Sequence, residues 1–348
     1  MAGWDLLVDR KDLRKAQIVS AEAPALADGE VRLEVERFSL TANNITYGII
    51  GDAFGYWKFF PAPDGLGRIP VWGFATVTES RAADVPVGLR LFGYLPMSTS
   101  FVMQLVKARS GFVDRAPHRA ELPPTYNAYN EAPADPLDDH RALLRPLLMT
   151  SFLLDDFLGE DEGLTSLVLS SASSKTALGL AWFAKARGRE VIGLTSPANA
   201  KLIEGLGLYD KVLTYDEVAA LKTRGPTAFV DFAGDRSGTA KVHAALGAGL
   251  NRSIIVGATH WEAGGGQVEI AGPTPTLFFA PDQIRKRMAD WGPGEVETRF
   301  DAALRAFVAD SSWLNLVQHQ GQQGLTEAYH LVLEGRVRPQ DGHIITPA

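Results

Sequence analysis

The chain between about residue 165 and residue 259 alternates short, continuous apolar runs with helix-like segments. The runs 166-SLVLSS-171, 190-EVIGLTS-196, 228-AFVDFA-233 and 253-SIIVGAT-259 show this pattern. Continuous apolar strands separated by helices are typical of a parallel sheet that is buried on both faces. The sequence therefore predicts a doubly wound α/β domain of the nucleotide-binding type.

The first ~145 residues have a different pattern, rich in strand-like segments between Gly/Pro punctuation. The segment 28-DGEVRLEVERFSLT-41 alternates apolar and polar residues, as a half-buried antiparallel strand does. The Pro- and Asp-rich stretch 117–139 is expected to be a long surface loop. The predicted domains are a β-rich domain over 1–145, a Rossmann domain over 146–280, and a tail over 281–348 that rejoins the first domain.

Composition excludes several classes of function. The chain has 34 Lys and Arg against 41 Asp and Glu, a net charge of −7, whereas nucleic acid and anionic membranes attract basic surfaces. It has no cysteine, which excludes a thiol nucleophile and any zinc site with a thiolate ligand. A metal site could then come only from histidines and carboxylates assembled in three dimensions. We find no apolar run of membrane-spanning length and expect a soluble, cytoplasmic protein.

The turn after the first apolar strand, 170-SSASSKT-176, is a P-loop without its glycines, a dinucleotide-binding turn with serines, or an ordinary strand-to-helix connection. Lys175 and Thr176 match the end of a P-loop, but Leu169 and Ser174 stand where that loop needs glycine. Alternatively, Ser171, Ser174 and Ala177 fall at the spacing of a G-x-x-G-x-x-G dinucleotide-binding turn, with small residues in place of glycine. A strand before the turn, a helix after it and a second strand about 20 residues on favour the dinucleotide interpretation.

The end of the second strand bears on the choice of cofactor. NAD-binding proteins usually place an acidic residue there, whereas 193-GLTSPANAK-201 offers hydroxyls and a lysine. These groups suit the 2′-phosphate of NADP(H), although Ser196 also suits a helix N-cap before Pro197. The predicted cofactor-binding residues of this region are Ser171, Ser173, Ser174, Lys175, Thr176, Thr195, Ser196 and Lys201.

The order of these elements resembles the medium-chain dehydrogenase/reductase superfamily, in its zinc-free, quinone-reductase-like branch. The resemblance rests on 30-EVRLEVERFSLTANNITYGIIGD-52, 86-PVGLRLFGY-94, 179-GLAWFAKARGREVIGLTS-196 and 206-LGLYDKVLTYDE-217. It implies a GroES-like β-barrel domain, a Rossmann domain, and a homodimer. It also implies an NADP(H)-dependent oxidoreductase that reduces a carbonyl or α,β-unsaturated carbonyl compound. Zinc-dependent members carry Gly-His-Glu where this chain has Trp72 and Gly73, so no catalytic zinc is expected.

The resemblance also implies site residues. Asn43, Asn44 and Tyr47 would lie near the nicotinamide and the substrate, with Tyr47 as the proton donor. Alternatively, the asparagines shape a turn and Tyr47 packs in the barrel. The resemblance further implies Tyr215 near the adenosine 2′-phosphate, and Gly257 and Thr259 against the nicotinamide. The aromatic run 55-GYWKFFP-61 predicts that Tyr56 and Trp57 line an apolar substrate pocket or cover the open end of the barrel, and His260 either contacts substrate or is solvated.

A second class of function stays open at this point. The turn lacks the glycines that reductases of this branch keep, so the chain could retain the fold without redox chemistry. It would then be a lyase- or isomerase-like enzyme, or a ligand-binding protein. The segment 278-FFAPDQIRKR-287 could be a lid or a dimer element.

Overall fold

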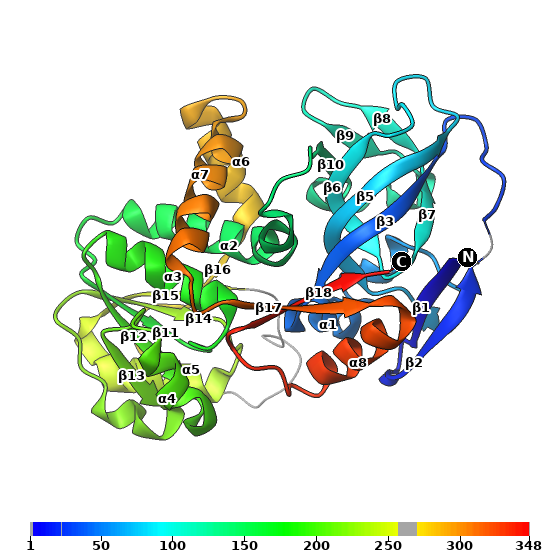
Figure 1. Ribbon diagram of the computed structural model, residues 1–348. Coiled ribbons are helices and arrows are strands. Elements are labelled where there is room, and N and C mark those ends of the chain that lie inside the picture. Colours follow the sequence, from blue (N-terminus) through cyan, green and yellow to red (C-terminus); the bar gives the residue numbers. More distant parts are fainter. Residues whose placement is uncertain (1–2, 22, 257–269, 348) are drawn as a thin grey trace. The chain divides into compact units, whose positions relative to one another are not determined.

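The computed structural model describes residues 3–21, 23–256 and 270–347 (Figure 1). The chain folds into two compact units. The β unit comprises residues 1–143 and 314–348, and the α/β unit comprises residues 144–313. None of the helices in the described part of the chain combines the length and the apolar composition that crossing a bilayer requires.

The α/β unit contains a sheet in which each strand runs parallel to its neighbours, in the order β13-β12-β11-β14-β15-β16. The strands are β11 (Ser166–Leu169), β12 (Glu190–Thr195), β13 (Lys211–Thr214), β14 (Thr227–Asp231), β15 (Leu250–Val256) and β16 (Thr276–Phe278). The connecting helices are α3 (Lys175–Ala186), α4 (Pro197–Gly205), the 3₁₀ helix η4 (Tyr215–Ala220), α5 (Arg236–Leu246) and the 3₁₀ helix η5 (Gly247–Gly249). This arrangement confirms the doubly wound parallel sheet predicted from the sequence.

The strands are continuously apolar because the sheet has a core on each face. Leu167 and Leu169 of β11 join one cluster of buried residues, which includes Leu178 of α3. Val168, which points to the opposite face, joins a second cluster with Phe229 of β14. Successive side chains of a strand alternate between faces, so a strand with a core on both sides favours apolar residues at successive positions. The polar residues of β11 and β14, Ser166, Thr227 and Asp231, stand at the strand ends.

The helices that precede and follow the sheet also belong to the α/β unit. They are α2 (Asp138–Gly159), which starts in the β unit, α6 (Ala280–Trp291) and α7 (Glu295–Asp310). The sequence analysis assigned residues 281–313 to the β-rich domain. In the structure, Val296 of α7 is buried in the same cluster as Leu153 of α2, with Ile284 of α6 packed against it, so α6 and α7 complete the core of the α/β unit.

The β unit is built from two sheets, in the orders β2-β1-β4 and β17-β18-β3-β5-β6-β10-β9-β8, with β7 paired to β3. Its first strands are β1 (Gly3–Asp9), β2 (Asp12–Ala21), β3 (Val31–Leu40), β4 (Leu66–Gly67), β5 (Pro70–Ser80) and β6 (Arg90–Pro96). The others are β7 (Ser100–Met103), β8 (Leu105–Lys107), β9 (Phe112–Asp114), β10 (Ala128–Glu131), β17 (Asn315–Gln320) and β18 (Asp341–Thr346). Its helices are α1 (Ala42–Ile49), α8 (Gly321–Leu333) and the 3₁₀ helices η1 (Tyr56–Lys58), η2 (Pro117–Arg119) and η3 (Pro124–Tyr126).

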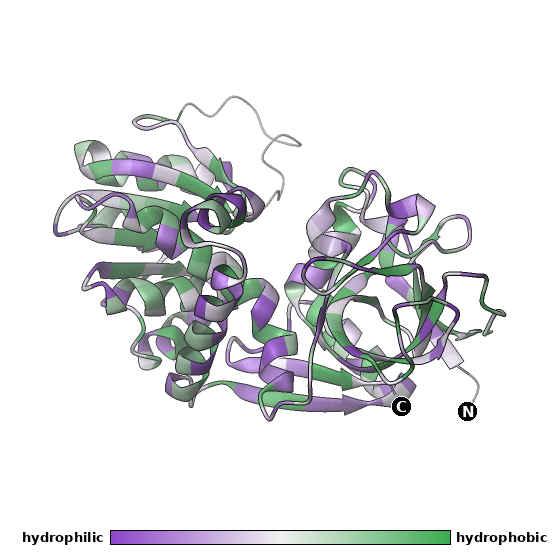
Figure 2. Cartoon of the chain, turned by 90° about the horizontal axis from the view of Figure 1, so that it is seen from above, coloured by the Kyte–Doolittle hydropathy of each residue, from purple (hydrophilic) through white to green (hydrophobic). Residues whose placement is uncertain are grey.

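A large apolar core holds the strands of the β unit together. Alternate residues of β3, namely Val31, Leu33 and Val35, are buried in it, and Tyr329 of α8 joins them. In Figure 2 the strands of this unit curve around a centre that these apolar side chains fill. Strand β18 pairs with β3, so the C-terminal segment returns to this unit as expected. Together the two units have the α/β fold class, a mixed β domain and a Rossmann-type domain, that the sequence predicted.

The stretch 117–139 is not the surface loop that its composition suggests. It contains η2, η3 and β10, and Arg119 is only 2% exposed. The guanidinium of Arg119 contacts the buried carboxylate of Asp114 at 2.9 Å and donates hydrogen bonds to the Phe59 carbonyl and the Tyr129 hydroxyl. A buried charge is stable only when it is paired and hydrogen-bonded. This network therefore anchors the stretch in the β unit.

Candidate functional site

The turn after β11 begins with a strained residue. Ser171 has φ 47°, and it is the non-glycine residue with a positive φ among the described residues. That left-handed conformation favours glycine, because a Cβ crowds the backbone. The N–H of Ser171 donates a hydrogen bond of 2.9 Å to the hydroxyl of Tyr215, the first residue of η4. The structure thus brings the predicted Tyr215 to the serine-rich turn, where it holds the residue in the glycine position.

The same turn leads into the N-terminus of α3. Ser174 is the N-cap, and its hydroxyl accepts a hydrogen bond of 3.2 Å from the N–H of Ala177. The N–H groups of Ser173 and Thr176 donate no hydrogen bond to any described residue. Free N–H groups at the positive end of a helix bind phosphate and other anions. Lys175, the first helical residue, lies between these donors in the chain.

The first turn of α4 lies beside the serine-rich turn. The side chain of Asn199 donates to the hydroxyl of Ser173 at 3.4 Å, a contact that sequence analysis did not predict. Ser196 is the N-cap residue of α4 and is partly exposed, and Lys201 is exposed. Thr195, at the end of β12, is only 1% exposed, so its hydroxyl lies inside the unit. The end of β12 and the start of α4 therefore present Ser196, Asn199 and Lys201, without an acidic side chain at the strand end.

A buried network joins the ends of β11 and β14, and sequence analysis missed it. The hydroxyl of Ser170 donates to the Asp231 carboxylate at 2.7 Å and accepts from the N–H groups of Phe232 and Ala233. The other oxygen of Asp231 accepts a hydrogen bond from Thr239 of α5 at 3.0 Å. Strands β11 and β14 flank the point where the strand order reverses, which is where such sheets bind ligands. The network fixes the carboxyl ends of both strands there.

Three predicted residues, Gly257, Thr259 and His260, lie outside the described residues.

In the β unit, Tyr47 receives two hydrogen bonds. Asn43 and Tyr47 are four residues apart on α1, which places them on one face of the helix. The Asn43 amide donates to the Tyr47 hydroxyl oxygen at 2.7 Å, and the indole N–H of Trp72 on β5 donates to it at 3.4 Å. Burial raises the pKa of Tyr47 to about 12, although both donors act in the opposite direction. The phenol is therefore protonated at neutral pH.

Asn44 has a structural role. It is only 2% exposed, and its side-chain oxygen accepts a hydrogen bond from the N–H of Thr41, the N-cap residue of α1. Its amide donates to the carbonyl of Pro70 at 3.0 Å. These contacts fix the start of α1 against β5. The structure thus brings Asn43 and Tyr47 together, while Asn44 supports the helix that carries them.

Aromatic rings surround the Tyr47 hydroxyl. The ring centroid of Tyr47 lies 4.6 Å from that of Tyr56, 5.6 Å from that of Tyr94 and 6.3 Å from that of Tyr126. The Tyr94 hydroxyl is buried and has no hydrogen-bond partner among the described residues. Sequence analysis missed Trp72 as a hydrogen-bond donor, as well as Tyr94 and Tyr126. These residues form an aromatic cluster that is polar at its hydroxyl groups and apolar elsewhere.

Trp57 does not belong to this cluster, although sequence analysis placed it in one pocket with Tyr56. Its ring is 3% exposed and lies between two glycines. A Cβ on Gly51 would lie 2.3 Å from the indole, and a Cβ on Gly67 would lie 2.4 Å from it. Adjacent residues of η1 therefore point to different places, and only Tyr56 reaches Tyr47.

No group of three or more His, Asp or Glu side chains in the described part of the chain is arranged to hold a metal ion. At the position where zinc-dependent relatives carry histidine, the Trp72 indole serves as a hydrogen-bond donor to Tyr47. An N–H donor and a phenol at this place can stabilise negative charge on a ligand oxygen.

Comparison with known proteins identifies a family whose description states no activity, and several solved structures with a similar fold. A family model described as "Protein of unknown function (DUF2855)" matches residues 38–338. No curated protein matches the chain. Among solved structures, CurA from Vibrio vulnificus is similar over 99% of both chains, with 13% identity and a TM-score of 0.67.

Two further solved structures are similar over nearly the whole of both chains. CurA in complex with NADPH covers 99% of each chain, with 14% identity and a TM-score of 0.65. A putative NADPH:quinone reductase from Mesorhizobium loti covers 100% of this chain and 99% of its own, with 15% identity and a TM-score of 0.66. These likenesses confirm the fold that the sequence resemblance implied, a β domain combined with a Rossmann-type domain.

Proposed function

The chain belongs to the DUF2855 family, whose description states no activity, and from that premise we propose that it is an NADP(H)-dependent oxidoreductase. Its substrate would be a small carbonyl or α,β-unsaturated carbonyl compound. The observation that carries the proposal is the pair of N–H donors on the Tyr47 hydroxyl.

Those two donors determine what Tyr47 can do. A phenolic oxygen can accept two hydrogen bonds and donate one. The amide of Asn43 and the indole of Trp72 use the accepting capacity, so the hydroxyl hydrogen remains available for an acceptor such as a carbonyl oxygen. The same donors would stabilise the phenolate that remains after the proton is given up. Tyr47 is thus suited to protonate an enolate or alkoxide oxygen, with Asn43 and Trp72 as positioning residues.

The α/β unit fits an NADP(H) molecule. The free N–H groups of Ser173 and Thr176 at the N-terminus of α3 suit its pyrophosphate, and Lys175 adds a positive charge. Ser196 and Lys201 would meet the 2′-phosphate, since no carboxylate stands at the end of β12 to repel it. When bound, the cofactor supplies the hydride. The protein then provides the proton and a turn shaped for phosphate.

The role of Tyr47 is tested by turnover of quinone and enone substrates with NADPH. Tyr47→Phe should lower kcat by roughly 10²–10⁴-fold, the usual contribution of a positioned proton donor. Affinity for NADPH should not change, since Tyr47 lies in the other unit from the phosphate turn. Tyr329→Phe is the matched control, because it removes a buried tyrosine hydroxyl of the same unit that donates to the Leu13 carbonyl and does not belong to the aromatic cluster. Equal losses in both variants would contradict the assignment to Tyr47.

The cofactor is tested by titration with NADPH and NADH, followed by nicotinamide fluorescence. Lys201→Ala should weaken the affinity for NADPH roughly tenfold, the effect of losing one charge-assisted contact, and leave the affinity for NADH unchanged. Lys175→Ala should weaken both, and Lys222→Ala, an exposed lysine of the same unit, should affect neither. No fluorescence change with either cofactor at near-millimolar concentration would contradict the proposal. It would favour the alternative of a protein that keeps the fold without redox chemistry.

A further inference from the structure

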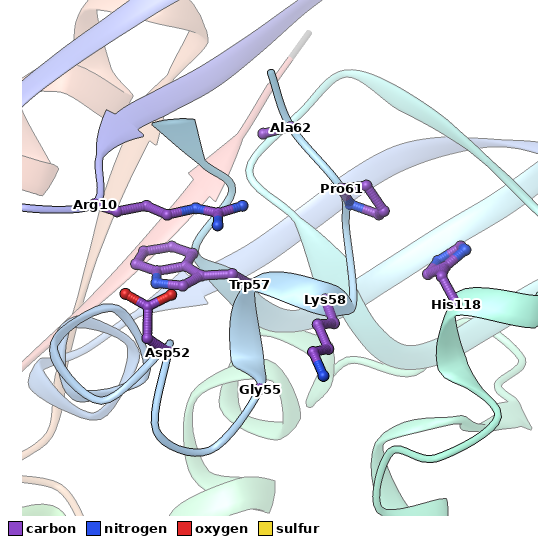
Figure 3. A pocket seen from close by; sticks show the side chains of 9 residues that line it. Arg10, Asp52, Gly55, Trp57, Lys58, Pro61, Ala62 and His118 are labelled. Carbon is purple, nitrogen blue, oxygen red and sulfur yellow. The ribbon is translucent and has the colours of Figure 1, made fainter. Parts of the chain in front are cut away.

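A cavity in the β unit, with a volume of about 390 Å³, is lined by residues other than those of the aromatic cluster around Tyr47. Arg10 after β1, Lys58 at the end of η1 and His118 in η2 all line it (Figure 3). Cavities that hold small molecules begin at about 300 Å³. Because Tyr56 points to the aromatic cluster while Trp57 and Lys58 line this cavity, neighbouring residues of η1 serve two separate places.

Two permanent cations line the cavity, the half-buried Arg10 and the exposed Lys58, together with the exposed imidazole of His118. In the described structure, the side chains of Lys58 and His118 have no hydrogen-bond or ion-pair partner, and Arg10 has no carboxylate within 4.0 Å. Asp52 is the acidic residue of the lining, and Figure 3 shows it across the Trp57 indole from Arg10. The chain as a whole carries a net charge of −7. A guanidinium and an ammonium without a carboxylate partner, with an imidazole beside them, favour an anion in such a chain.

The arginine is already held in place for binding. Its Nε donates to the carbonyl of Leu66 at 2.7 Å, and its guanidinium carbon lies 5.7 Å from the centroid of Trp57. Trp57 is itself fixed between Gly51 and Gly67. The terminal N–H groups of a guanidinium match the two oxygens of a carboxylate or a phosphate. Because the Arg10 side chain is already fixed by Leu66 and Trp57, it loses less conformational entropy on binding a ligand than a mobile surface arginine would.

We propose that this cavity is a binding site for the oxyanion group of a small molecule, a phosphate or a carboxylate. Arg10, Lys58 and His118 contact the oxyanion, and Pro61 and Ala62 contact the body of the ligand. The site shares no residue with the cofactor turn or with Tyr47, so the proposed anion binding can be tested independently of the proposed oxidoreductase activity.

The test uses the protein labelled with ¹³C-histidine. The buffer is cationic, so that it does not compete for the site, and chloride keeps the ionic strength constant. Inorganic phosphate, phenyl phosphate and benzoate are titrated while the His118 ring signal, assigned with His118→Gln, is followed by NMR. We expect saturable shifts, and the ratio of phenyl phosphate to benzoate affinity distinguishes the two oxyanions. Lys58→Met should weaken binding about tenfold, the loss of one charge-assisted contact.

Lys107→Met provides the matched control, because Lys107 is an exposed lysine of the same unit that does not line the cavity. Arg10→Met should also weaken binding, but it touches the Trp57 packing, so Lys58→Met is the decisive variant. Shifts that never saturate would overturn the proposal. Equal affinity in Lys58→Met and Lys107→Met would overturn it as well.

Discussion

Replacing Ser171 with glycine should stabilise the protein. A non-glycine residue in the left-handed region costs about 1–2 kcal/mol, and glycine loses about 0.5–1 kcal/mol more chain entropy on folding. With φ at 47°, Ser171→Gly should therefore raise the free energy of unfolding by about 0.5–1 kcal/mol. For a unit of this size the thermal midpoint should rise by about 1–3 °C, measured by circular dichroism. Ser173→Gly, at a residue without a positive φ, is the control and should destabilise.

Tyr215 supplies the second half of this prediction. Tyr215→Phe removes the 2.9 Å hydrogen bond to the Ser171 N–H and should cost about 1 kcal/mol. Tyr215→Phe should also weaken NADPH binding, because Ser171 is then free to leave the left-handed conformation. Glycine holds that conformation without strain, so Ser171→Gly should restore the NADPH affinity of the Tyr215→Phe variant. A Ser171→Gly protein less stable than the natural one, or a double variant no better than Tyr215→Phe, would refute the reasoning.

Two further predictions concern stability. The pKa of Tyr47 is about 12 in the folded chain and about 10 in an unfolded one, so its contribution to the free energy of unfolding is fully present below pH 10 and is lost between pH 10 and 12. Tyr47→Phe should therefore make the free energy of unfolding fall less steeply over this pH range. An unchanged slope would contradict the effect of burial on this pKa. Gly179→Ala would place a Cβ 2.7 Å from Leu148 and 2.8 Å from Ser151, where α3 meets α2, and should cost about 1–3 kcal/mol in thermal unfolding. Gly205→Ala, at a helical glycine with open space around it, should instead stabilise by up to about 1 kcal/mol.

The parallel sheet could be predicted because a sheet buried on both faces requires short, mostly apolar segments that can be recognised in the sequence. Strands β11 and β14 are buried at every position and apolar except at their ends, as strands covered on both faces are expected to be. Helix α2 was missed because Pro146 lies inside it, and proline normally ends a helix. The assignment of 281–313 failed because amphipathic helices show that they pack against a core, without showing which core.

The site was less predictable, because its contacts join residues that are far apart in the chain. Ser170 and Asp231 are separated by 61 positions, and nothing near either residue signals the other. Tyr126 stands in a segment whose proline and aspartate content suggests exposure, yet it lies in the aromatic cluster. Trp72 was noticed only for the histidine that it replaces. Asn43 and Tyr47 were named from the family resemblance alone, and their hydrogen bond follows from α1, a helix that sequence analysis did not predict and that brings residues four apart together.

The packing of Trp57 between Gly51 and Gly67 has a consequence for how this family can vary. At 2.3 and 2.4 Å, neither glycine can gain a methyl group while the indole stays. A chain with a smaller residue at position 57 would leave a void that side chains at both glycine positions could fill. The three positions should therefore covary among DUF2855 relatives, with glycine at 51 and 67 wherever tryptophan stands at 57.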